Sequence, residues 1–205
     1  MKAEHFEVLV EEPSMEAFLT EFLPKFIGDR ATFRVYVHQG KSDLLNKLEA
    51  RLRGYSKWLP ENFRIIVLVD CDDDDCVVLK ERLEKACAVA GLSTRANRKT
   101  PIWQVANRIC IEELEAWFFG EWAGVRRAYP KVSGTVNNKI SYRHCDSIQG
   151  GTWEAFERVL KLGGYFSGGL RKVEAARKIG KQFNHETCVS PSFKVFRDVI
   201  IEAME

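Results

Sequence analysis

Residues 64–75 read RIIVLVDCDDDD, and this stretch decides the fold. The first six residues are rich in β-branched side chains, a pattern typical of a strand buried on both faces of a parallel sheet. Five carboxylates follow within six positions: Asp70, Asp72, Asp73, Asp74 and Asp75. Parallel α/β sheets bind their ligands at the carboxyl ends of the strands. The cluster therefore predicts a divalent cation site, with Asp74 among its candidate ligands.

A second acidic turn follows the apolar residues 6–10 and begins at Glu11. If the two strands are neighbours, Glu11 lies beside Asp70 and Asp72. Side chains two apart on an extended chain point the same way, so both aspartates can approach one Mg²⁺ or Mn²⁺ ion. Glu11 would then complete the ligand set or act as general base on an attacking water.

A structural explanation is available for part of this acidity. Carboxylates are favourable at helix N-termini, and a capping role explains Asp74 and Asp75. Glu12 and Glu16 fit the same role in the helix that follows the first acidic turn. Capping does not explain five aspartates, so the metal interpretation is favoured for the cluster as a whole.

Apolar periodicity predicts an α/β fold with a mostly parallel sheet flanked by helices. We expect strands at residues 6–10, 33–37, 64–69 and 102–110, with helices between them that begin at Ser14, at Ser42 and near Asp75. Further helices are expected at residues 111–119, 122–129, 153–162, 170–183 and 192–204, and a long loop at 131–151. Residues 1–120 would form the α/β core. Residues 121–205 would form a C-terminal helical extension packed on it within one structural domain.

The composition excludes some classes of protein. The chain has 205 residues, is 45% hydrophobic and carries a net charge of +2, which favours no particular partner. No apolar run approaches the roughly 20 residues that span a membrane, and the N-terminal stretch lacks a signal-peptide pattern. The six cysteines form no CxxC pair, which favours a reducing, cytoplasmic location.

Carboxylates in the helix expected after the fourth strand form a third element. Glu115 borders the apolar face of that helix, and Glu112 lies one turn back on the same side. A half-buried carboxylate is costly without a metal, lysine or arginine partner. Arg108 and Lys139 are the ion-pair alternatives, and Glu113 is expected to face solvent.

Several basic residues are candidates for contacts with a substrate phosphate. Lys41 and Ser42 lie in HQGKSD at a predicted helix N-terminus, although valine at position 35 excludes a complete P-loop motif. Arg143 and His144 lie in the long loop, and Lys139 precedes them. The alternative for these three is a solvated surface, and the residues near His144 supply too few ligands for zinc.

The chain resembles the Toprim domain, which pairs a glutamate after its first strand with a D-x-D after a later one. The segments VEEPSMEAFL, HQGKSDLLNKL, LVDCDDDDC, IEELEAWFFG and SPSFKVF resemble in particular the domain-of-unknown-function family number four-two-seven-six. The match departs at Glu12, where Toprim proteins usually carry glycine.

The resemblance implies a Toprim-like sheet and Mg²⁺-dependent chemistry on phosphodiesters. Glu11, Asp70 and Asp72 would be the catalytic and metal-binding residues, and Glu112 and Glu115 would hold a second ion. The leading hypothesis is a nuclease, in a bacterial defence setting with a partner ATPase. The alternatives are a non-catalytic binding or regulatory subunit of a larger complex and a nucleotidyl- or phosphotransferase acting on a small substrate.

Overall fold

The sheet has four strands, all parallel, in the order β2-β1-β3-β4. The computed structural model describes residues 1–205. The strands are β1 (His5–Val10), β2 (Thr32–Val37), β3 (Phe63–Asp70) and β4 (Val105–Cys110). This arrangement confirms the predicted α/β class with a parallel sheet. It also confirms that the strands preceding the two acidic turns, β1 and β3, are neighbours.

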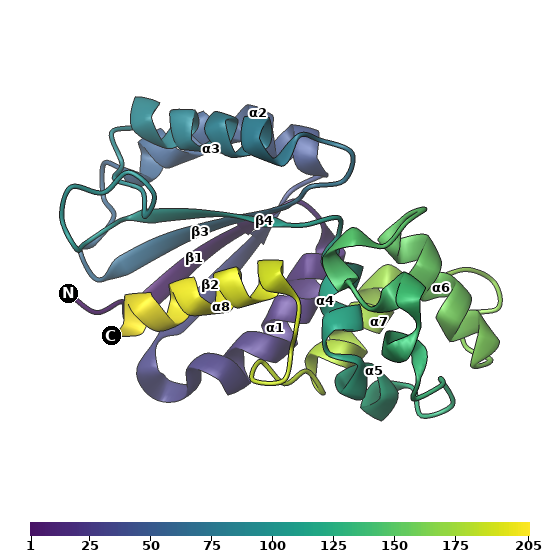
Figure 1. Cartoon of the computed structure of the whole chain (residues 1–205). Coiled ribbons are helices and arrows are strands. Elements are labelled where there is room, and N and C mark those ends of the chain that lie inside the picture. The colour runs from purple at the N-terminus through teal and green to yellow at the C-terminus, as the bar shows by residue number, and fades with distance from the viewer.

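Helices cover both faces of the sheet (Figure 1). α2 (Lys41–Tyr55) and α3 (Cys76–Val89) lie on one face, and α1 (Pro13–Ile27) and α8 (Pro191–Met204) lie on the other. Successive residues of β3 alternate between two apolar clusters, with Ile65 and Val67 on the α2–α3 side and Ile66 and Leu68 on the other. Burial on both faces explains why this strand is a continuous apolar run.

The remaining four α-helices gather beside the carboxyl ends of the strands (Figure 1). They are α4 (Leu114–Gly120), α5 (Trp122–Ala128), α6 (Thr152–Leu162) and α7 (Lys172–Gly180). The ring of Phe18 on α1 lies 5.9 Å from that of Trp117 on α4 and 5.0 Å from that of Phe183. α7 packs closely on α1. A Cβ added at Gly180 would lie 2.8 Å from the carbonyl oxygen of Phe18, so there is no room for a side chain at this position.

The helical extension expected at residues 121–205 shares its core with the sheet. One apolar cluster of 45 buried residues includes side chains from β1, α4, α6 and α8. The backbone N–H of Ala3 donates to the carbonyl oxygen of Ala203, at 2.6 Å. The last helix is therefore a covering layer of the sheet.

Two helices begin earlier than expected. Glu12, not Ser14, is the N-cap residue of α1, because proline is well suited to the first helical position. Gly40, not Ser42, is the N-cap residue of α2, and its φ of +89° is one that glycine adopts without strain. Asp75 caps α3 as predicted, since its side chain accepts hydrogen bonds from the backbone N–H groups of the first turn.

The segments around the fourth strand and the long loop also differ from expectation. β4 begins at Val105 instead of residue 102, since Ile102 is exposed and Gln104 bonds to Ser93. The loop at 131–151 contains three short 3₁₀ turns: Val136–Asn138, Ile140–Tyr142 and Cys145–Ser147. All six cysteines are free. None of the helices combines the length and the apolar character needed to cross a membrane.

Candidate functional site

Glu11 and Asp70 meet where β1 and β3 end. The Glu11 carboxylate accepts a hydrogen bond from the backbone N–H of Asp70, with 2.5 Å between Oε1 and N. Both residues are buried, with 6% and 5% of their surface exposed. The backbone N–H of Gly40 donates to the carbonyl oxygen of Glu11 at 2.8 Å, which fixes the start of α2 beside the same turn. The parallel pairing of neighbouring strands therefore holds both carboxylates at one edge of the sheet.

Lys41 lies across the aspartate loop. Its Nζ is 2.7 Å from Asp72 Oδ2 and 2.8 Å from Asp74 Oδ2, and it donates to the carbonyl oxygen of Cys71 at 3.0 Å. Burial lowers the pKa of Lys41, but its hydrogen bonds to the two aspartates outweigh this and leave the pKa above its usual value. Lys41 is thus engaged by aspartates in this structure, while Ser42 is exposed in the first turn of α2.

The carboxylates after β4 are arranged differently from the prediction. Glu112 precedes α4 and does not lie on it, so it does not share a helix face with Glu115. The backbone N–H of Asp72 donates to the carbonyl oxygen of Glu112 at 3.0 Å, and the two residues have φ values of 46° and 63°. Left-handed backbone is uncommon for residues other than glycine, although aspartate adopts it more readily than most. The hydrogen bond between these two positions joins the loops after β3 and β4.

Glu113 is half-buried, which contradicts its predicted place on the surface. It accepts a hydrogen bond from the backbone N–H of Trp153 at 2.9 Å, and Lys172 Nζ lies 3.6 Å from its other oxygen. Burial raises the pKa of Glu113, and the positive charge of Lys172 opposes that change. These partners lie on α6 and α7, far along the chain, and the local sequence pattern gives no signal of them.

Glu115 points into the protein from the first turn of α4. It is 2% exposed, and its Oε2 is buried with no hydrogen-bond partner. Burial raises the pKa of Glu115 to about 7, with the charge of Lys172 acting in the opposite direction. Neither Arg108 nor Lys139, the ion-pair partners suggested by the sequence, forms an ion pair with it.

The side chain of Asp70 is unsatisfied in the same way as that of Glu115. Its Oδ1 is buried and has no hydrogen-bond partner, and burial raises the pKa of Asp70 well above its usual value. The negative charges of Glu11 and Glu12 raise it further. Burial also raises the pKa of Glu11 to about 7, although its bond from the Asp70 backbone opposes this. Buried polar atoms normally have partners, so the unpartnered oxygen of Asp70 is a position where a further donor or a cation would be favourable.

The donor chemistry fits a hard divalent cation, although the side chains do not form a preassembled cage. No group of three or more His, Cys, Asp or Glu side chains is positioned to hold a metal ion. The available donors are carboxylate oxygens, which Mg²⁺ and Mn²⁺ prefer. Asp70 and Glu115 each have one buried carboxylate oxygen without a partner.

Glu12 stands where Toprim proteins usually carry glycine. Its φ of −137° and ψ of 159° are those of extended backbone, so this position does not need a glycine.

The basic residues of the long loop form no ion pairs with these carboxylates. Lys139, Arg143 and His144 are exposed, and none of them forms an ion pair. Arg143 and His144 line a pocket of about 290 Å³ together with Asp146 and Pro191. The structure brings Glu11, Asp70, Asp72, Asp74 and Lys41 into one network, with Glu112, Glu113 and Glu115 beside it. The loop cations are not part of that network.

Fold and site together define an α/β protein with a group of carboxylates at the carboxyl edge of a four-stranded parallel sheet. Comparison with family models matches residues 10–201 to the domain of unknown function DUF4276. The chain belongs to this family. The searches of curated proteins and of solved structures found no match.

Proposed function

We propose that the protein is a divalent-metal-dependent phosphodiesterase acting on nucleic acid, most simply a nuclease. The observation that carries this proposal is the Asp70 carboxyl oxygen, buried without a partner beside Glu11 at the end of the sheet. A buried anion without compensation is unfavourable, and a hard cation would supply the missing charge. When bound, Mg²⁺ or Mn²⁺ would polarise a phosphodiester and lower the pKa of an attacking water.

The roles of the protein's own groups follow from their positions. Asp70 and Asp72 would hold the cation, with Asp74 beside them. Glu11 would be a further ligand or a general base, in an orientation fixed by its hydrogen bond from the Asp70 backbone. Glu112 and Glu115 would serve a second ion.

Substrate contacts would come from the cations around the site. Lys41 would contact a substrate phosphate once its bonds to the aspartates are exchanged for bonds to the substrate. The exposed Lys139, Arg143 and His144 would contact more distant phosphates. The free cysteines support a cytoplasmic protein, and the Toprim resemblance supports a role in phage defence beside a partner ATPase.

A second candidate is a non-catalytic binding or regulatory subunit. Lys41 favours it, because its ammonium group already neutralises part of the aspartate cluster. In that arrangement the site holds an internal cation and needs no metal.

Calorimetric titration with Mg²⁺ and Mn²⁺ tests the proposal first, with the Asp70→Asn variant compared against the wild type. The matched control is Asp29→Asn, which removes an exposed carboxylate in the turn after α1. We expect the wild type and the control to bind the ions with micromolar to millimolar affinity, and Asp70→Asn to lose this binding. Lys41→Met should strengthen binding by freeing Asp72 and Asp74. Absence of binding in all four proteins would refute the metal site.

Cleavage assays then separate the two candidates. Single- and double-stranded DNA, RNA and tRNA are incubated with the protein and Mn²⁺, alone and with a co-purified ATPase partner. Cleavage that disappears with chelator and in Asp70→Asn supports the nuclease. Metal binding without cleavage of any polymer supports the regulatory subunit, and turnover of free nucleotides alone would indicate a transferase.

A further inference from the structure

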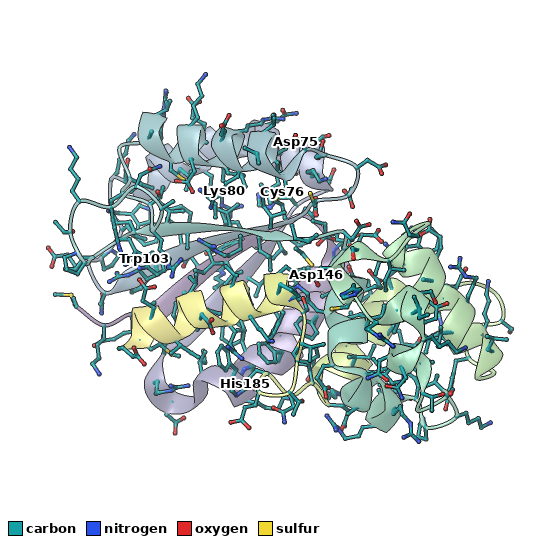
Figure 2. All side chains as sticks on the ribbon, viewed as in Figure 1. Asp75, Cys76, Lys80, Trp103, Asp146 and His185 are labelled. Carbon is teal, nitrogen blue, oxygen red and sulfur yellow. The ribbon has the colours of Figure 1, made fainter.

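A pocket outside the carboxylate site lies along the free edge of the sheet. We call it the β4 pocket: it has a volume of about 290 Å³, and its lining includes Cys76, Lys80, Arg108, Ile109, Ile111 and Val195. β4 is an edge strand, and the chain near Thr94 pairs only with its first residue, Val105. The pocket follows the rest of that edge, between α3 and α8. In Figure 2, Cys76 and Lys80 lie on the side of α3 that faces the sheet.

The walls of the β4 pocket are mainly apolar. Ile109 and Ile111 come from the end of β4 and the residues after it, and Val195 comes from the outer side of α8, where it is 46% exposed. A concave apolar site with few polar groups is the usual form of a small-molecule pocket, and this volume is at the lower end of the range, at roughly 300 Å³. The ligand must therefore be small.

Arg108 is the polar feature that selects the ligand. Its Nε is buried without a hydrogen-bond partner, and its guanidinium group forms no ion pair. Burial and the positive charge of Arg95 lower the pKa of Arg108. The negative charges of Glu84 and Glu202 oppose this change, but Glu84 is paired with Lys80 and Glu202 with Arg95.

Lys80, the other cation of the β4 pocket, is already satisfied. Its Nζ lies 3.0 Å from Glu84 Oε1 and donates to the carbonyl oxygen of Asn107 at 2.6 Å. The unmatched positive charge in the pocket is thus that of Arg108 alone. A guanidinium group in this situation is suited to a carboxylate or phosphate, which accepts two of its N–H groups at once.

We propose that the β4 pocket binds a small organic anion, with a carboxylate or phosphate paired with Arg108 and an apolar body against Ile109, Ile111 and Val195. Two sources share this chemistry. One is a free metabolite. The other is a nucleotide unit of the substrate strand, and this version rests on the proposed function.

The position of the pocket gives the nucleotide source its physical basis. Cys76 directly follows Asp75 of the aspartate loop, and Ile111 directly precedes Glu112. The β4 pocket therefore begins next to the carboxylate site. A strand whose phosphodiester lies at that site would have a neighbouring base and phosphate within reach of Arg108.

Binding is tested with anilinonaphthalene sulfonate, a fluorescent anion on an apolar body, in buffer with chelator. Arg108→Met keeps an unbranched apolar stem but removes the guanidinium group and its charge, and Val195→Trp fills the pocket. We expect each variant to bind the probe at least about tenfold more weakly, the loss typical of a charged hydrogen bond or a blocked site. Arg158→Met, which removes an exposed arginine on α6, and Asp70→Asn should bind like the wild type.

The proposal is overturned if Arg108→Met binds the probe as tightly as the wild type does and unfolds at the same temperature. It is also overturned if the wild type shows no saturable binding of the probe. Displacement of the probe by adenosine monophosphate identifies the nucleotide source, and displacement by benzoate alone identifies a free carboxylate. Failure of both competitors, or equal competition by inorganic phosphate, also overturns the proposal. Because the chelator removes divalent ions, this result does not depend on whether the carboxylate site binds metal.

Discussion

Glu115→Gln should change how the stability of the metal-free protein depends on pH. Glu115 is 2% exposed, one of its oxygens has no partner, and burial raises its pKa from 4.5 to about 7. Below the lower value the carboxyl is protonated in both the folded and the unfolded state. Between the two values the folded state binds the extra proton, so stability falls as the pH rises toward 7. Above 7 the folded protein holds a buried negative charge, and the full loss of stability is present.

The size of the effect follows from the difference between the two pKa values. A difference of about 2.5 units corresponds to about 3 kcal/mol, at roughly 1.4 kcal/mol per unit. Glutamine has nearly the same shape and does not ionise. Relative to the wild type, Glu115→Gln should therefore gain about 3 kcal/mol in its free energy of unfolding between roughly pH 4 and pH 8.

Urea denaturation with chelator, followed by tryptophan fluorescence and circular dichroism, measures this difference at each pH. Glu81→Gln, an exposed position on α3, is the control and should follow the wild type at every pH. Parallel pH profiles for Glu115→Gln and the wild type would show that the carboxylate is not buried unpaired in solution. The reasoning about the site's missing charge would then lose its support.

Two further predictions concern the elements that hold the site. Asp75→Ala should lower the free energy of unfolding by about 1 kcal/mol, because it removes the side-chain cap of α3. Urea titration measures this difference. An unchanged free energy of unfolding would contradict the capping role of Asp75. Gly180→Ala should destabilise the protein, since its Cβ would lie 2.8 Å from the carbonyl oxygen of Phe18. The control is Gly54→Ala on α2, where the added Cβ would have no atom within 4 Å. This variant should raise the free energy of unfolding by up to about 1 kcal/mol. Equal melting temperatures for the two alanine variants would argue against close packing of α1 and α7.

The sheet could be predicted because its strands carry strong local signals. The apolar run in β3 is long enough to require burial on both faces, and acidic turns after β1 and β3 mark their carboxyl ends. The contact between Glu11 and the Asp70 backbone follows from the order of the strands in the sheet. Connections in parallel sheets are short and right-handed, so only a few strand orders are possible.

The surroundings of the later carboxylates could not be predicted in the same way. Helical periodicity placed Glu112 on a helix, but the bond between its carbonyl oxygen and the Asp72 backbone holds it in a left-handed turn. Glu113 is predicted to face solvent from its place on the expected helix, but its partners, Trp153 and Lys172, come from helices that only the tertiary fold brings near. Local sequence patterns report local structure, and these contacts are long-range.

The position of α8 has a consequence for how the protein is made. The strand that enters the sheet first in chain order, β1, shares its covering layer with the last helix, and Ala3 bonds to Ala203 across that layer. Until the ribosome has released α8, one side of the nascent sheet exposes apolar surface that α1 alone does not cover. Contacts between such distant segments form slowly, and an intermediate of this kind is prone to aggregate. Synthesis should therefore depend on chaperones that shield this surface until the last helix arrives.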